Sequence, residues 1–267
     1  MANRSTIAER AYREKNPDLA KKAHTQRLIE HSVYHPDEHR GSGTYLGDSV
    51  YGALDGMVTT FAVVAGVAGA NLAPSIILIM GFANLFADGF SMAASNYLSK
   101  KSEQDYHAQE RAREQWEVEN FPKGEVEEIR QIYKKKGFTG NDLERAVVII
   151  TSDKKRWVET MMVEELGLLP HQGSALTAAM VTFFSFLLWG FLPLLTYVLI
   201  SFFPALSERA FTISCILTAL GIFTAGSLRS RFIAKSWWRA GLEMLVVGGA
   251  AAGVAYLVGY FLRGVAQ

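Results

Sequence analysis

Residues 176–203 read LTAAMVTFFSFLLWGFLPLLTYVLISFF, and not one of them is charged. A helix needs roughly 20 apolar residues to cross the ~30 Å hydrocarbon core of a bilayer, and this stretch is long enough to do so. Apolar helices also occur in the cores of soluble proteins, but those are usually shorter. The stretch therefore predicts a membrane-spanning helix.

Charge is segregated along the whole chain in the same way. The net charge of +1 conceals this pattern and gives no reason to expect a nucleic-acid partner. Five apolar runs are long enough to be spans, at residues 48–70, 73–99, 174–200, 210–228 and 241–262. The chain is thus predicted to be an all-α membrane protein with four regions: a polar tail (1–47), two spans (48–99), a helical insert (100–172) and three more spans (173–263).

Basic residues fall in the connections on one side of the predicted membrane. Lys100 and Lys101 follow the second span, and the loop between the fourth and fifth spans holds Arg229, Arg231, Lys235 and Arg239. Because cytoplasmic loops carry an excess of Lys and Arg, we expect the tail and the insert to be cytoplasmic and the C-terminus to be external. The polar start of the chain argues against a signal peptide. Cys215, the only cysteine, can form neither a disulfide nor a Cys-based zinc site within one chain.

Carboxylates inside the apolar runs are candidates for a transport path. Asp55 and Asp88 lie deep in the first two spans, where a carboxylate costs ~2.5–3.5 kcal/mol to insert and so faces a cavity or a partner. For Asp48 and Glu243, close to span ends, an interfacial position is the favoured interpretation. A polar stripe follows helical spacing in the second span, at Asn84, Asp88, Ser91, Met92 and Asn96. Helix–helix hydrogen bonding also produces such stripes, but a carboxylate beside a thioether suits a first-row metal ion.

The insert is predicted to contain four helices, at residues 100–120, 125–136, 141–151 and from Ser152 or Asp153 to Leu166. Glutamates recur three residues apart on the first two, and the fourth adds two methionines and a glutamate. Like charges at this spacing repel one another unless a cation lies between them. Two interpretations stay open, a metal site and a solvated acidic face; acidic residues on soluble helices usually form a solvated face, and adjacent methionines are more often core packing. The residues concerned are Glu114, Glu117, Glu125, Glu128, Met161, Met162 and Glu165.

Four motifs together resemble the vacuolar iron transporter family over about residues 48–263. Two lie in the first two spans, DGMVTTFAVV at 55–64 and ADGFSMAA at 87–94. The others lie in the insert: Glu-x2-Glu-x7-Glu-x2-Glu from Glu114 to Glu128, and Met-Met-x2-Glu from Met161 to Glu165. Each motif alone is weak, and their joint occurrence in this order is specific.

This resemblance implies five spans per subunit, a homodimer and a cytoplasmic insert that binds metal. It implies export of Fe²⁺, often also Mn²⁺, from the cytosol in exchange for protons, with these ions as cargo and no tightly bound cofactor. The seven insert residues named above would bind the metal, and Asp55, Met92 and Asp48 would line the membrane path. Asn84 departs from the pattern, because a family carboxylate corresponds to it, and this leaves proton coupling open. The tail has no counterpart that we can assign.

The function expected from sequence is therefore metal transport, with divalent ions and the lipid bilayer as partners and no enzymatic reaction. The membrane would be the plasma or inner membrane in a bacterium and a vacuolar-type membrane in a eukaryote. One alternative is a membrane-anchored metal buffer or ferroxidase-like protein that acts only through its insert. Another is a structural membrane protein whose acidic insert docks a basic surface.

Overall fold

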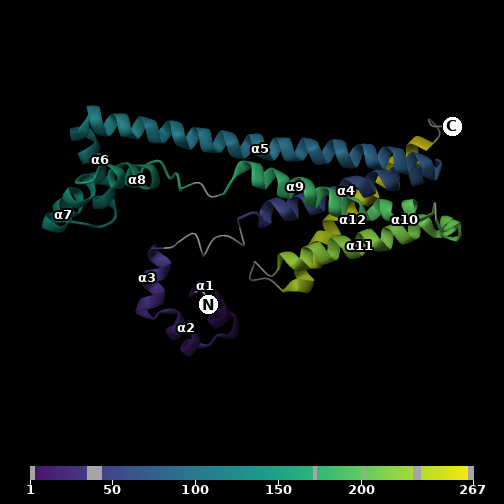
Figure 1. Cartoon of the computed structure of the whole chain (residues 1–267), viewed down its shortest axis with the longest axis horizontal. Coiled ribbons are helices and arrows are strands. Elements are labelled where there is room, and N and C mark those ends of the chain that lie inside the picture. The colour runs from purple at the N-terminus through teal and green to yellow at the C-terminus, as the bar shows by residue number, and fades with distance from the viewer. Residues whose placement is uncertain (1–3, 35–43, 171–172, 201, 231–235, 264–267) are drawn as a thin grey trace. The chain divides into compact units, whose positions relative to one another are not determined.

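The computed structural model describes residues 4–34, 44–170, 173–200, 202–230 and 236–263. Throughout these residues the regular structure is helical, which confirms the predicted all-α class (Figure 1). The chain forms two compact units. One comprises Met1–Ala93 with Thr177–Gln267, and the other comprises Ala94–Leu176.

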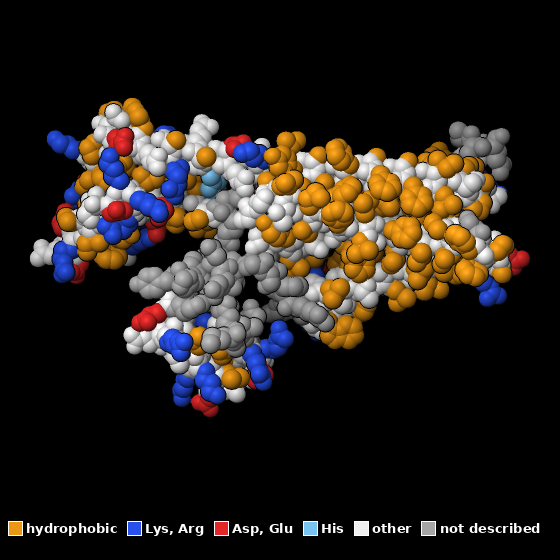
Figure 2. All heavy atoms as spheres, in the orientation of Figure 1, with side chains coloured by type: hydrophobic (Ala, Val, Ile, Leu, Met, Phe, Trp, Pro, Cys, Tyr) orange, Lys and Arg blue, Asp and Glu red, His pale blue; other side chains and the backbone are white. Residues whose placement is uncertain are grey.

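Four helical segments within the described residues are long and apolar enough to cross a membrane, and a bent pair of helices makes a fifth if it crosses as one. Figure 2 shows hydrophobic side chains covering the region of these helices, while charged side chains gather over α6, α7 and α8. The four are α4 (Leu46–Gly69), α5 (Pro74–Asn120), α11 (Ala210–Arg229) with the 3-10 turn η2 (Pro204–Arg209) before it, and α12 (Trp237–Leu262). The bent pair is α9 (Ala175–Gly190) and α10 (Leu192–Ile200).

The predicted span over residues 174–200 is bent, which the sequence pattern did not indicate. The axes of α9 and α10 differ by 44°, and the break falls at Phe191. Pro193 lies in the first turn of α10, where its missing N–H and its ring disfavour a helix that continues from the preceding turn. The Ser214 hydroxyl donates a buried 2.7 Å hydrogen bond to the Pro193 carbonyl, so the broken region is tied to α11.

Glycines bring the backbones of the membrane helices into direct contact around α4. A Cβ atom built on Gly259 of α12 would lie 2.2 Å from the carbonyl oxygen of Gly66 in α4. On another side of α4, a Cβ on Gly56 would lie 2.4 Å from the carbonyl oxygen of Phe186 in α9. Small residues permit this approach, which is typical of helix packing in membranes. The helix that carries Asp55 is therefore held by backbone contacts.

The insert unit is built from the C-terminal part of α5 and three short helices, α6 (Pro122–Lys135), α7 (Gly140–Thr151) and α8 (Lys154–Glu164). They enclose a core that includes Ile129, Val147 and Trp157. Asp153 caps α8 as predicted, since its carboxylate accepts a 2.7 Å hydrogen bond from the Arg156 N–H. The predicted start of the second insert helix at residue 125 was wrong: α6 begins at Pro122, because proline suits the first helical turn.

The polar tail is more ordered than its composition indicated. Three helices occupy its described residues: α1 (Arg4–Glu14), α2 (Pro17–Ala23) and α3 (Gln26–Tyr34). Asn16 caps α2 by accepting hydrogen bonds from the N–H groups of Asp18 and Leu19. The sequence pattern had predicted no helix in these residues.

We predict that Gly259→Ala lowers the apparent melting temperature of the detergent-solubilised protein, because the added methyl group must displace the α4 backbone. Overpacking of this kind costs about 1–3 kcal/mol. Gly253→Ala is the matched control on α12, since no atom lies within 4 Å of a Cβ built there. Equal melting temperatures for the two variants would contradict the backbone contact.

Candidate metal centre

Five candidate carboxylates come from three segments of the insert unit. Glu114 and Glu117 lie on α5, Glu125 and Glu128 on α6, and Glu165 forms the C-cap of α8. The Glu114 side chain is 1% exposed and the Glu125 residue 5%. Glu117 is partly buried, whereas Glu128 and Glu165 keep contact with solvent. Glutamate is almost never fully buried without a partner, so Glu114 and Glu125 need an explanation.

The five carboxylates lie close enough for their charges to act on one another. Burial, together with the negative charges of Glu128 and Glu114, raises the pKa of Glu125 to about 7. The pKa of Glu165 is raised to about 7 by burial of its carboxyl group and by the same two neighbours. Burial also raises the pKa of Glu114. The structure thus brings together the glutamates that the sequence places on separate helices.

One oxygen on each of the two buried glutamates has no hydrogen-bond partner in the described residues. These atoms are Oε2 of Glu114 and Oε2 of Glu125, and both are shielded from solvent. A buried polar atom without a partner costs about 1–3 kcal/mol, and more when it is charged. Two buried acceptors with unused lone pairs are what a cation-binding site requires.

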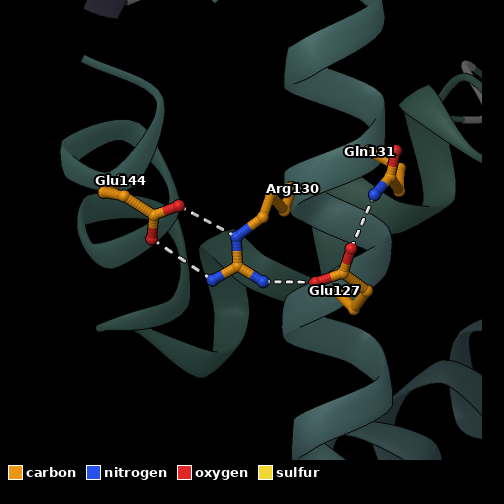
Figure 3. Close-up of polar contacts among 4 residues, drawn as sticks. All are labelled: Glu127, Arg130, Gln131 and Glu144. Carbon is orange, nitrogen blue, oxygen red and sulfur yellow. Dashed lines mark hydrogen bonds and ion pairs between the residues drawn. The ribbon is translucent and has the colours of Figure 1, made fainter. Parts of the chain in front are cut away.

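The outer face of α6 shows how a structural glutamate differs from these. Glu127 is exposed and accepts hydrogen bonds from Gln131 and from the Arg130 guanidinium, which also binds Glu144 of α7 at 3.0 and 3.2 Å (Figure 3). These hydrogen bonds lower the pKa of Glu127. Acidic residues on α6 therefore serve two purposes: Glu127 binds Arg130, which links α6 to Glu144 of α7, while Glu125 carries an unsatisfied oxygen.

Met161 and Met162 are buried, with exposed fractions of 0% and 5%. Both belong to the hydrophobic core of the insert, together with Ile129 and Val158. Core packing is thus sufficient to explain both methionines. In sequence they nevertheless lie just before Glu165, a member of the carboxylate cluster. Among the described residues no three or more His, Cys, Asp or Glu side chains are arranged to hold a metal ion. Binding one ion with this set therefore requires side-chain rotation.

Sequence reasoning missed Arg113, whose guanidinium lies among these carboxylates. It forms ion pairs with Glu110 at 2.9 Å, Glu114 at 3.1 Å and Glu117 at 3.7 Å. Glu110 was missed as well, although at 9% exposure it is more buried than the predicted ligands Glu117, Glu128 and Glu165. The helical spacing of Glu110, Arg113 and Glu117 was the available signal, since residues three or four apart are neighbours on a helix.

In the membrane unit, Asp55 of α4 and Asp88 of α5 are both partly buried, and their charges act on each other. Met92 lies one turn after Asp88 and is partly buried against the membrane core. Asn84 lies one turn before Asp88, and its amide nitrogen has no partner among the described residues. Two predicted path residues, Asp88 and Met92, thus share one polar stripe of α5, and Asp55 of α4 is near enough to feel the charge of Asp88. Asp48 is separate, in the first turn of α4.

Met57, the thioether within the DGMVTT stretch, belongs elsewhere. It is fully buried and packs with Ile222, Ala225 and Met244 in an apolar cluster. It follows Asp55 by two residues, and residues two apart on a helix do not face the same way. The structure therefore identifies Met57 as a packing residue.

We predict that Glu125→Gln stabilises the insert at about pH 8 in the presence of a chelator and has little effect at about pH 5. The raised pKa means that the neutral carboxyl favours folding below the ordinary value of 4.5, and that this stability is lost as the pH rises through about 7. Glutamine does not ionise, so the variant retains this stability at the higher pH. Hydrogen exchange of α6 and α8 in the full chain, compared at matched pH, measures the effect.

Glu127→Gln is the matched control on the same helix. It loses charge-assisted hydrogen bonds to Arg130 and Gln131, so it should not protect α6 at the higher pH. Protection by Glu125→Gln that is equal at both pH values, or faster exchange at the higher pH, would show that the Glu125 carboxyl is not held unfavourably charged.

Known proteins resemble this chain over most of its length. The VIT family model matches residues 46–260. The "Vacuolar iron transporter" of Toxoplasma gondii is 36% identical over 96% of this chain and 87% of its own length. That of Plasmodium falciparum is 33% identical over 98% of each chain, and the "Vacuolar iron transporter 1" of Arabidopsis thaliana is 32% identical over 86% of this chain and 90% of its own.

The extent of these matches corrects one expectation about the tail. Because the P. falciparum alignment covers 98% of this chain, it includes most of residues 1–47. The expectation that the tail has no counterpart was therefore wrong. The resemblance drawn from the four motifs is confirmed, and the chain belongs to the VIT family.

Proposed function

We propose that the chain is a transporter that moves ferrous iron, and also manganese, out of the cytosol in exchange for protons. The observation that carries this proposal is the pair of buried carboxylate oxygens without partners, on Glu114 and Glu125, in a chain whose relatives are named vacuolar iron transporters. Carboxylate oxygens suit hard divalent ions, and thioethers suit softer ones. A set of both favours borderline first-row metals.

In this proposal the insert captures metal from the cytosol. The ligands are the seven insert residues of the sequence analysis, with Glu114 and Glu125 as the buried oxygens and Met161 and Met162 as the soft donors. Divalent charge offsets the repulsion that the glutamates exert on one another. Because metal and protons compete for the same oxygens, binding releases protons and acid conditions favour release of the metal.

The membrane path runs past the carboxylates of the first two spans. Asp55 and Asp88 act on each other across α4 and α5, and Met92 adds a thioether one turn from Asp88. Asp48, in the first turn of α4, belongs to one end of this path. Charged residues at such depth generally line ion pathways. The basic residues lie in the connections on one side of the membrane, which supports a cytoplasmic insert and tail. In this topology α9 and α10 cross together as one of five spans.

A homodimer belongs to the same proposal. The family resemblance supports it, and α5 leaves large apolar side chains uncovered, including Phe86 at 56% and Phe90 at 70% exposure. Transport requires no covalent chemistry, so the chain is proposed to be a carrier and not an enzyme.

A metal buffer or ferroxidase-like protein is the second candidate. The compactness of the insert unit favours it, because the buried carboxylates lie wholly within Ala94–Leu176. This second candidate leaves Asp55 and Asp88 without a function. Metal uptake into proteoliposomes separates the two proposals, since a buffer binds metal without moving it across the bilayer.

We predict that Asp55→Asn abolishes Fe²⁺ uptake into proteoliposomes while leaving membrane insertion intact. Asparagine retains the shape and much of the hydrogen bonding of aspartate, but it has neither a negative charge nor a proton to release. Glu243→Gln is the control, because Glu243 is an exposed carboxylate near the start of α12. Near-normal uptake by Asp55→Asn would remove Asp55 from the path and leave Asp88 as the next candidate.

We also predict that Glu114→Ala combined with Glu117→Ala weakens Mn²⁺ binding by the full chain by roughly tenfold or more. The exposed ion-pair residues Glu119 and Glu159 provide the control, since their double substitution removes the same number of charges from the insert. Calorimetry on the detergent-solubilised proteins measures both. Equal affinities would favour the solvated-face interpretation of Glu114 and Glu117.

A further inference from the structure

Arg113 divides one guanidinium among three carboxylates. Its three nitrogens each face a different glutamate: Nη1 faces Glu110, Nη2 faces Glu114 and Nε faces Glu117. The contact with Glu114 is a hydrogen bond of 3.1 Å to Oε1, the oxygen next to the one that has no partner. Arginine frequently binds a single carboxylate through two parallel hydrogen bonds. The divided arrangement neutralises a cluster instead of forming one strong pair.

Two of the three partners are proposed metal ligands, and the third is not. Glu114 and Glu117 belong to the motif from which metal binding was inferred, whereas Glu110 lies one turn earlier on α5, outside that motif. A divalent ion bound to the oxygens of Glu114 and Glu117 would come within a few ångströms of the guanidinium. Like charges at that separation repel strongly where the surroundings are partly desolvated. The metal ion and Arg113 therefore compete for the same oxygens.

Glu110 provides a place for the displaced guanidinium. It already holds Nη1 at 2.9 Å, and its side chain is 11% exposed against 47% for that of Arg113. A half-exposed arginine can change rotamer without leaving its helix or disturbing the core. Rotation toward Glu110 would keep the arginine paired and would free the oxygens of Glu114 and Glu117.

We propose that Arg113 is a built-in competitor of the transported metal: it holds Glu114 and Glu117 until a divalent ion replaces it, and it then pairs with Glu110 alone. The inference rests on the proposed function of the insert and adds a regulation of that same site. Its consequence is a weaker and faster-exchanging metal site than the ligands alone would form. A carrier that must release its cargo needs such a site.

Arg111 shows that this arrangement is particular to Arg113. It lies two residues earlier on the same helix and pairs only with Glu159, at 3.5 Å, with both side chains near half exposure. Within the described insert, where residues 94–170 are continuous, it forms no ion pair with a candidate glutamate ligand. Arg111→Gln therefore removes the same charge from the same helix without removing the competitor.

The test is Mn²⁺ binding by the full detergent-solubilised chain, with calorimetry for affinity and stopped-flow mixing with a chelator for release. Arg113→Gln should bind Mn²⁺ roughly tenfold more tightly and release it more slowly, while Arg111→Gln should bind like the unsubstituted protein. Arg113→Lys retains the charge but cannot reach three carboxylates at once, so its affinity should fall between the two.

Glu110→Gln provides a second measurement that does not depend on the folding of Arg113→Gln. It removes the alternative partner, so it should weaken Mn²⁺ binding, and this effect should disappear when Arg113→Gln is also present. Unchanged or weaker binding by Arg113→Gln, with the helical content retained, would overturn the inference and make Arg113 a support of the site. No Mn²⁺ binding by the unsubstituted chain would instead overturn the proposed insert site itself.

Discussion

The constraint on which the insert depends is the burial of carboxylates of like charge within a small core. Glu114 and Glu125 are almost completely shielded, and each has an oxygen without a hydrogen bond in the described residues. Such a cluster is stable only if protons, a guanidinium or a metal ion offset its charge. The raised pKa of Glu125 and the ion pairs of Arg113 are the first two of these. Metal binding, as proposed, is the third, and all three act on the same oxygens.

A different constraint acts on the membrane unit, because lipid provides no hydrophobic driving force for helices to associate. Close approach of backbones at glycines takes its place, with Gly66 against Gly259 and Gly56 against Phe186. These contacts hold α4, and with it the costly carboxylate of Asp55, at a defined position. The bend between α9 and α10 belongs to the same packing, since Ser214 satisfies the carbonyl of Pro193 at the break. Precise placement of a charged side chain thus follows from residues that carry no charge.

Much of the fold could be predicted from sequence, because charge segregation and helix signals are local. The spans, the cap at Asp153 and the stop at Gly137, whose φ is +97°, are read from composition and spacing. The bend at Phe191 has a local signal in Pro193, which the apolar composition of the run concealed, whereas the hydrogen bond from Ser214 of α11 has none. The glutamates of the candidate site were found by spacing. Their burial and the role of Arg113 depend on how α5, α6 and α8 pack, so spacing alone favoured the solvated face, and only the family resemblance favoured the metal site.

The measurement that tests the central claim most directly is proton release on metal binding. Calorimetric titration of the full chain with Mn²⁺, in two buffers of different ionisation enthalpy, counts the protons that leave for each ion bound. The account predicts saturable binding with proton release that increases as the pH falls from about 8 toward 6, because Glu125 and Glu165 have pKa values of about 7. Binding without proton release, or no saturable binding, would contradict the claim that these carboxylates hold the metal.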